Sequence, residues 1–353
     1  MGKSVTLSDI ATRCGVSIVT VSKALSGQKG VSEATRQQIS EAAQEMGYLR
    51  SRAVEQSTDL NYTVGVVAAA RYFTDRLSLY WNVYRDLSVR LAKKGCFCLL
   101  ELVSEEEEEE GKLPGLLDGR HINGLFVLGS LKPSYVRNLE NTAQIPLVFV
   151  DTLSILGNND SVISNNFLGG QRMVEELLKL GHEHIGFVGT LRTTNSIDDR
   201  YLGGMKALME KGLSYAAGWL IDDRDPETGR PYEAAELRVP ESSVPSAFFC
   251  SSDRSAQVFS EKLQEMGLRV PENVSLVGFD NYEEGGAGKP FFTTYDINRG
   301  EMAKRAVHVL LHRIENEEYR SGVSLIQGKC VMRMSTKRLG DPVPDAPSGG
   351  RKE

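Results

Sequence analysis

Residues 5–48 read VTLSDIATRCGVSIVTVSKALSGQKGVSEATRQQISEAAQEMGY, and this stretch decides the fold of the N-terminal part of the chain. It predicts three short helices, because each apolar run follows a residue suited to cap a helix start, namely Thr6, Ser17 and Ser32. Gly15 lies in the turn CGVS between the first two helices and lets the chain reverse sharply. Helix, glycine-containing turn and helix form the unit that places its second helix in the major groove of DNA.

The same stretch carries a more specific pattern. The run TLSDIA-x2-CGVS-x2-TVSKALSG-x3-VSEATR-x8-E-x-GY resembles the N-terminal domain of the LacI/GalR family of transcriptional regulators. The resemblance continues in LLKLGHEHIGFVG, RYLGGMKAL, GLRVPENVSLVGFD and FTTYDINRGEMAKRA, and it runs from about Thr6 to Arg338. It implies that a two-lobed, sugar-binding sensor similar to the periplasmic binding proteins follows the DNA-binding domain.

Length and composition limit the classes of protein that fit. A chain of 353 residues with 41% hydrophobic and 25% charged residues is typical of a soluble globular protein of two or three domains. The net charge of −6 excludes a protein that is polybasic throughout. The first 60 residues contain seven Lys/Arg and six Asp/Glu, so we expect affinity for DNA to depend on a dimer and a shaped interface.

The sequence predicts a cytoplasmic protein without a cofactor. No apolar run approaches about 18 residues, which argues against a membrane span, and the N-terminus lacks the hydrophobic core of a signal peptide. The five cysteines are scattered and lack a CxxC pair, which favours reduced thiols over a metal or redox site. The six glutamates at 105–110 surround a helix and cannot converge on one ion, so we expect a solvated helix start there.

From Tyr62 onward, buried-strand runs such as YTVGVVAAA and IPLVFVD alternate with amphipathic helices, and the pattern restarts after about residue 160. This order predicts parallel sheets with helices on both faces. The expected fold is therefore a small all-α helix-turn-helix domain followed by an α/β two-lobed periplasmic-binding-protein-like domain. The expected ranges are 1–49 for the DNA-binding domain, 50–61 for a hinge, 62–336 for the effector-binding and dimerisation domain, and 337–353 for a disordered tail. Within the large domain, lobe 1 is expected at about 62–160 plus 298–325, and lobe 2 at about 161–297 plus 326–336.

The second helix carries the residues expected to contact DNA. Family resemblance implies that Ile18 and Val19, which open this helix, touch base edges, and their apolar side chains suit a thymine methyl group. Alternatively they belong to the small core, although Val21 is a better core candidate. Lys23 has a donor for guanine. The full expected DNA-binding set, with short hydroxyls for phosphates or bases, is Thr6, Ser17, Ile18, Val19, Thr20, Ser22, Lys23, Arg50 and Arg52.

The hinge departs from the family pattern. Arg50 and Ser51 stand where the family has Pro-Asn, and Ser57 stands where the family has a leucine that wedges into the minor groove. Without that wedge we expect weaker bending of the operator. Arg50 and Arg52 are then expected to contact the phosphate backbone or a narrow minor groove.

The resemblance also implies an effector site. Asp151 and Asp280 end strands and Arg200 lies in a helix, at positions where the family contacts its ligand, although each is alternatively a salt bridge or a cap. The family's Asn-Asp pair is here Ser252 and Asp253, which offers fewer donors.

Five further residues bear on the expected effector site. Ile297 stands at a position that is polar in the family, so the pocket is expected to be less polar. Tyr72, Tyr80, Trp81 and Trp219 are candidates for stacking on a sugar, with a core position as the alternative for Trp81.

Together these features predict a dimeric transcription factor, a repressor of the family type, that binds double-stranded operator DNA and a sugar or sugar phosphate. A regulator controlled by a protein partner and, less favoured, a solute-binding protein stay open as alternatives. No catalytic constellation is visible, so we expect no enzyme activity.

Overall fold

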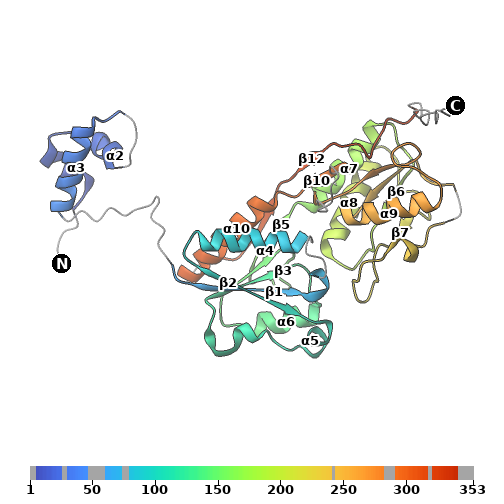
Figure 1. The fold of residues 1–353 in the computed structure, drawn as a ribbon, viewed down its shortest axis with the longest axis horizontal. Helices are drawn as coiled ribbons and strands as arrows, with labels where there is room; N and C mark the ends of the chain where they lie inside the picture. Colours follow the sequence, from blue (N-terminus) through green and yellow to red (C-terminus); the bar gives the residue numbers. More distant parts are fainter. Residues whose placement is uncertain are drawn as a thin grey trace, which may run out of the picture. The chain divides into compact units, whose positions relative to one another are not determined.

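The computed structural model describes residues 5–25, 30–46, 60–73, 79–240, 243–281, 291–316 and 320–340. The chain divides into two compact units, 1–57 and 58–353 (Figure 1). The expected hinge residues Arg50, Arg52 and Ser57 lie outside the described residues, as do 341–353 of the tail expected at 337–353. Of its first residues, Lys337 donates its N–H to Ser275 Oγ at 3.1 Å and Leu339 donates its N–H to the carbonyl of Leu180 at 2.8 Å. Within the described part, no helix is long and apolar enough to cross a membrane, and no three His, Cys, Asp or Glu side chains gather as metal ligands would.

The described residues of the first unit form three helices, as predicted: α1 (Leu7–Cys14), α2 (Ile18–Leu25) and α3 (Glu33–Glu45). Thr6 forms a capping box with Asp9, and Gly15 ends α1 with a φ of 66°, in the left-handed region that favours glycine. The hydroxyls of Ser17 and Ser32 accept backbone N–H groups three residues later, at 3.1 Å and 3.2 Å. Around these caps the helices pack on a small core that includes Ile10, Val21, Ala24 and Ile39.

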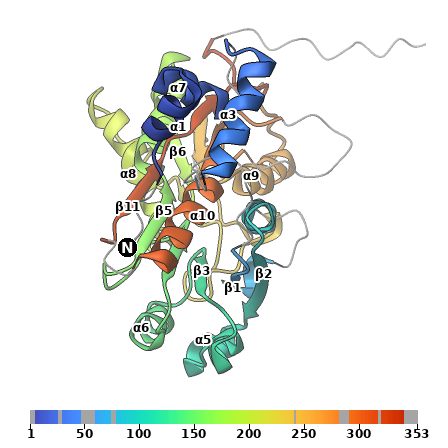
Figure 2. The same ribbon diagram turned by 90° about the vertical axis from the view of Figure 1, so that its left-hand side faces the viewer.

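The first lobe of the second unit is built on a six-stranded parallel sheet with the order β11-β5-β4-β3-β1-β2. Side chains alternate between its two faces. One face packs on α4 and α10, and the other packs on α6 (Figures 1 and 2). The strands are β1 (Thr63–Ala69), β2 (Phe97–Val103), β3 (Gly124–Leu128), β4 (Leu147–Val150), β5 (Asp160–Ser164) and β11 (Val323–Ile326). The helices are α4 (Leu79–Ala92), α5 (Glu105–Glu110), α6 (Pro133–Thr142) and α10 (Arg299–Glu315), with 3-10 turns η1 (Ala70–Tyr72) and η2 (Gly115–Arg120).

The second lobe has a four-stranded parallel sheet with the order β7-β6-β8-β9. Its strands are β6 (Ile185–Val188), β7 (Leu220–Ile221), β8 (Ala247–Cys250) and β9 (Ser275–Val277). The helices are α7 (Asn166–Lys179), α8 (Asn195–Met209) and α9 (Asp253–Glu265), with the 3-10 turn η3 (Ala234–Glu236). A separate antiparallel pair joins β10 (Thr294–Asp296) to β12 (Lys329–Val331). The predicted α/β architecture with parallel sheets is confirmed.

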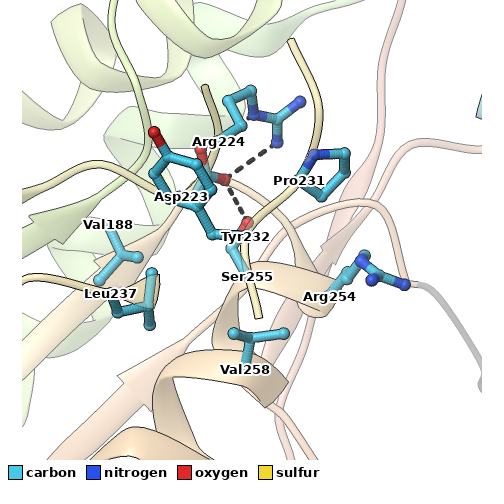
Figure 3. A pocket seen from close by; sticks show the side chains of 9 residues that line it. All are labelled: Val188, Asp223, Arg224, Pro231, Tyr232, Leu237, Arg254, Ser255 and Val258. Atoms are coloured by element: carbon cyan, nitrogen blue, oxygen red, sulfur yellow. Dashed lines mark hydrogen bonds and ion pairs between the residues drawn. The ribbon is translucent and has the colours of Figure 1, made fainter. Parts of the chain in front are cut away.

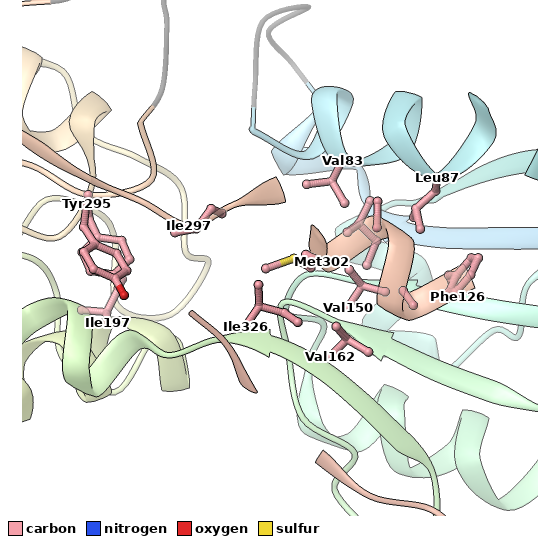
Figure 4. Packing of buried hydrophobic residues seen from close by; sticks show 14 of the residues in the cluster. Val83, Leu87, Phe126, Val150, Val162, Ile197, Tyr295, Ile297, Met302 and Ile326 are labelled. Carbon is pink, nitrogen blue, oxygen red and sulfur yellow. The ribbon is translucent and has the colours of Figure 1, made fainter. Parts of the chain in front are cut away.

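The chain passes between the lobes three times: after β5, between β10 and α10, and between β11 and β12. Figure 4 shows Ile297 and Ile326 on two of these passages, in one buried cluster with residues of both lobes. Ile297 is fully buried there. The expected lobe boundary at residue 160 falls at the start of β5, and the whole of β5 belongs to the first sheet.

The Glu-rich segment also differs from its prediction. Its helix ends at Gly111, whose φ of 67° lies in the left-handed region. Glu108 is fully buried, because its carboxylate forms an ion pair with Arg71 and accepts the backbone N–H of Lys132 at 2.6 Å. The run is therefore solvated on one side only.

Candidate DNA-reading helix and effector cleft

The helix α2 separates its apolar residues into a buried and an exposed set. Val21 is fully buried and Ala24 is nearly so, whereas Ile18 and Val19 are 50% and 62% exposed. Two neighbouring apolar side chains that stay in water at a helix start are costly unless something covers them. The alternative that Ile18 and Val19 belong to the small core is therefore wrong.

The hydroxyl residues of this unit have structural partners. The Thr6 hydroxyl donates to Asp9 Oδ2 at 2.7 Å, and the Ser17 hydroxyl lies 2.8 Å from that of Thr20. Arg36 of α3 donates to the carbonyl of Ala24 at 2.7 Å and so fixes the C-terminal end of α2. Ser17 and Arg36 therefore fix the two ends of α2, while the side chains of Ser22 and Lys23 are exposed.

In the second unit, the predicted acids lie just beyond strands and have unusual backbone conformations. Asp151 directly follows β4 with a φ of 58°, and Asp280 lies three residues after β9 with a φ of 86°. Non-glycine residues in this region store strain, which is typical of functional sites. Tyr80 of α4 donates to Asp151 Oδ2 at 3.0 Å, while Asp151 Oδ1 is buried without a hydrogen-bond partner among the described residues.

Arg200 is buried in α8 and is held from several sides. Its Nε donates to Asn166 Oδ1 at 2.9 Å, its Nη1 donates to the carbonyl of Ser251 at 2.6 Å, and its guanidinium lies 4.0 Å from the centre of the Phe279 ring. Burial lowers the pKa of Arg200, while the nearby carboxylates of Asp151 and Asp280 act in the opposite direction. The structure thus brings Asp151, Arg200 and Asp280 near one another, although they lie far apart in the sequence.

Two glycines make this position of Arg200 possible. A Cβ on Gly203 would lie 1.9 Å from the carbonyl oxygen of Phe167, and one on Gly170 would lie 2.1 Å from that of Arg200. The backbones of α7 and α8 therefore touch, and no side-chain rotation can relieve such a clash.

Ser252 and Asp253 have more local roles than predicted. The Ser252 hydroxyl accepts the N–H of Ser255 at 3.0 Å and caps α9. Asp253 is buried, and its carboxylate lies against Gly278, where a Cβ would come within 1.9 Å of Oδ1. Ser252 thus has a structural role at the start of α9.

Sequence reasoning missed a pair of charged residues beside the cleft, Asp223 and Arg224 (Figure 3). Arg224 donates to Asp223 with Nε and Nη2, both at 2.9 Å, and the hydroxyls of Ser251 and Ser255 also donate to Asp223. Burial alone raises the pKa of Asp223, but Arg224 and these hydroxyls outweigh it and hold the pKa well below its ordinary range. The signal in the sequence was the charged run DDRD at 222–225, which follows a strand of only two residues, β7.

The aromatic candidates divide between lobe cores and the edge of the first lobe. Trp219 is buried in the second lobe against Phe248, so its predicted role in stacking on a sugar is wrong. Trp81 packs on Phe73 with ring centres 4.8 Å apart, as the core alternative predicted. Tyr72 and Tyr80 lie 4.9 Å apart and stay candidates.

The second unit has a small hollow beside the candidate site and a larger one far from it. The small one beside Asp223 and Arg224 has a volume of about 10 Å³, enough for one water molecule. The larger one, about 630 Å³, is lined by residues 113–123 and 142–146 at the amino ends of β3 and β4. In open α/β sheets ligands bind at the carboxyl ends of the strands. The candidate site is therefore the group of polar side chains that meet at those ends, and not the hollow with the larger volume.

Comparison with known proteins agrees with both units. Residues 6–51 match the family model for bacterial regulatory proteins of the lacI family, and residues 174–336 match the periplasmic binding protein-like domain. The HTH-type transcriptional repressor PurR of Klebsiella pneumoniae (strain 342) is 30% identical over 338 residues, which cover 94% of this chain and 96% of that protein.

Solved structures share the fold. The transcriptional regulator CelR in a cellobiose complex is 24% identical with a TM-score of 0.63, over 94% of this chain and 99% of that one. The lac repressor dimer bound to operator and the anti-inducer ONPF is 23% identical with a TM-score of 0.64, over 95% of this chain and 100% of that one.

Proposed function

The chain belongs to the lacI family of bacterial regulatory proteins, and we propose that it represses transcription as a homodimer whose operator affinity is set by a carbohydrate-type effector. That it is a DNA-binding transcriptional repressor of this family follows from the matched domains and from the relatives. The effector class, the dimer and the individual site residues are the proposed parts.

One observation carries the DNA-binding role: the exposed apolar start of α2. Ile18 and Val19 stay exposed while the same helix buries Val21, so this turn is free to meet an external surface. A thymine methyl group gives apolar side chains of this size a specific partner in the major groove. Lys23, exposed one turn further along, supplies a donor for guanine or phosphate.

Selection of DNA sites from a random pool, with the full-length protein, tests this role. We expect a near-palindrome, because two copies related by a two-fold axis read two half-sites. Val19→Ala should relax the preference at one base step per half-site without abolishing binding. If Val19→Ala selects the same sites with the same stringency, the proposed contact is wrong.

The effector role rests on the cluster of Asp151, Arg200 and Asp280. Polar groups held rigidly in a buried site discriminate well, because a ligand that leaves one of them unmatched loses affinity. The CelR structure carries cellobiose, which supports a carbohydrate class for this fold. Repeating the selection with sugars tests it: enrichment that changes with a sugar supports the proposal. Indifference to every sugar favours control by a protein partner.

The dimer proposal rests on exposed apolar side chains at an edge strand. Phe97 and Leu99 on β2 are 67% and 42% exposed, and Val89 on the neighbouring α4 is 50% exposed. Exposed apolar edge strands are a hazard for a monomer and are commonly covered by a second copy. We expect Phe97→Asp to yield monomers by light scattering, and retention of a dimer would exclude this surface.

A further inference from the structure

Helix α10 of the first lobe carries two exposed histidines that neither the DNA-reading helix nor the candidate effector site includes. His308 and His312 are four residues apart, which places their side chains on the same face of the helix on successive turns. Their ring centres lie 6.1 Å apart and the ring planes differ by only 12°. The structure thus brings two imidazoles, the side chains that most often bind transition metals, to one spot on the surface.

The backbone that carries this pair is held firmly. The opposite face of α10 buries Val307, Leu310 and Leu311 in the core of the first lobe. On another side, Arg305 Nε donates to Ser324 Oγ of β11 at 3.1 Å. A metal ion bound by both imidazoles therefore has to order two side chains only, and not a loop.

The position of the pair in its helix favours a cation. His312 lies in the last turn of the 17-residue α10, where the partial negative charge of the helix end is concentrated. Glu315 follows His312 by three residues and is exposed on the same face. Both features attract positive charge to the pair.

Two basic side chains near the pair have acidic partners. Arg313 lies 3.3 Å from Asp160 of β5, and Lys304, one turn before His308, lies 3.0 Å from Glu301. These carboxylates offset part of the positive charge, and so reduce the repulsion that a bound cation would meet.

We propose that His308 and His312 form a surface site for one divalent transition-metal ion of the class that imidazole binds, such as Ni²⁺, Zn²⁺ or Cu²⁺. A metal ion lies about 2.0–2.1 Å from each bound imidazole nitrogen, so the ring centres have to approach by about 1 Å. Rotation of the two exposed side chains allows this approach. Among the described residues no three His, Cys, Asp or Glu gather as metal ligands would, so water completes the coordination. Two protein ligands predict a dissociation constant of about 1–100 μM.

The principal test is calorimetric titration of the untagged, full-length protein with Ni²⁺. We expect one ion per chain in that affinity range, and His308→Ala and His312→Ala should each weaken binding at least about tenfold. His184→Ala is the matched control, because it removes an exposed histidine that lies outside the pair, and it should leave the affinity unchanged. Absence of binding to the wild-type protein would overturn the proposal.

The partly exposed thiols of Cys14, Cys98 and Cys330 are the competing ligands. Alkylation of the cysteines with iodoacetamide should leave Ni²⁺ binding intact. Binding that alkylation abolishes and that both histidine variants retain would assign the ion to sulfur and refute the proposed site.

A restored pair tests whether the spacing matters. In the His312→Ala background, Lys304→His places a new histidine four residues before His308, and Glu301→His places one seven residues before it. Both substitutions start from exposed positions and remove the same ion pair. Lys304→His should return the affinity to within about threefold of wild type, whereas Glu301→His should not. Equal binding by the two variants would show that a histidine pair one turn apart is not the binding unit.

Discussion

The DNA-reading unit and the cleft unit use charge and burial in opposite ways. In the first unit, the apolar residues expected to meet DNA, Ile18 and Val19, are exposed and adjacent at the start of one helix. In the second unit Asp151, Arg200 and Asp280 are buried and come from elements far apart in sequence. Arg200 is held there by hydrogen bonds to Asn166 and to the carbonyl of Ser251. The difference teaches that a DNA-reading surface can be changed at little cost in stability, whereas the effector site is part of the core that holds its lobe together.

The largest effect is expected from Arg200→Met. Removing the guanidinium leaves Asn166 and the Ser251 carbonyl without their donor and leaves Asp151 and Asp280 without their positive neighbour. Breaking a buried charged network from one side costs about 3–5 kcal/mol. Both tryptophans of the chain lie in the second unit, so urea unfolding followed by tryptophan fluorescence reports this unit alone.

Arg192→Met is the matched control for this variant, because it removes an exposed arginine from the loop before α8. Its unfolding free energy should stay within about 0.5 kcal/mol of wild type. If the two variants behave alike, Arg200 does not tie the site to the stability of the lobe, and the contrast between the units fails.

The next largest effect is expected from Gly203→Ala. The new Cβ would lie 1.9 Å from the Phe167 carbonyl oxygen, so α7 and α8 must move apart. We expect a loss of about 3 kcal/mol by the same fluorescence measurement, together with a weakened effector response, because α8 carries Arg200. Gly322→Ala, where no atom lies within 4 Å of the added Cβ, should cost far less. If both variants lost the same unfolding free energy, the close approach of α7 and α8 would not be the cause of the loss at Gly203.

In the first unit, a pair of valines separates stability from recognition. Val21→Ala should destabilise this unit by about 2 kcal/mol, because the side chain is fully buried, whereas Val19→Ala should change its stability by less than about 0.5 kcal/mol. Hydrogen exchange of peptides from residues 5–46, read by mass spectrometry, measures each loss locally. Faster exchange in Val19→Ala than in Val21→Ala would reverse the assignment of the two faces of α2.

The first unit could be predicted almost completely from sequence, because its determinants are local. Caps, the glycine turn and the apolar spacing all act within four residues, and the structure confirms each at Thr6, Gly15, Ser17 and Ser32. Its second helix could even be divided into a core side and an exposed side by comparing Val21 with Ile18.

The second unit could be predicted less completely, because its determinants are distant in sequence. Sequence located the strand ends that carry Asp151 and Asp280, but not β5, α6, β10 or β11, whose short or polar runs lack a clear period. It read Glu108 as solvated, since nothing local reveals that Arg71, 37 residues away, lies beside it. Trp219 was a candidate for stacking on a sugar because sequence cannot show which side of a lobe a residue faces.

The smallest effect is expected from Asp151→Asn, and it depends on pH. Burial raises the pKa of Asp151 above its ordinary value of 3.8, while Arg200 and Tyr80 oppose the shift. The folded protein therefore holds this proton more tightly than the unfolded chain does. The resulting stabilisation is complete below pH 3.8 and is lost as the pH rises through the raised value. Asparagine is neutral throughout and can still accept the Tyr80 hydroxyl, so the variant should gain stability relative to wild type as pH increases.

Thermal unfolding of both proteins across this pH range measures the difference. Asp225→Asn is a control of opposite sign, because backbone N–H groups of Thr228 and Glu227 lower the pKa of that exposed carboxylate. The stability that the Asp225 carboxylate contributes is present at high pH and is lost on acidification. The Asp225→Asn variant should therefore become less stable than wild type as pH increases. A loss of stability in Asp151→Asn at neutral pH would mean that the carboxylate charge supports the fold. In that case Asp151 would be a structural counter-ion of Arg200, and the strain at its backbone would no longer point to a ligand.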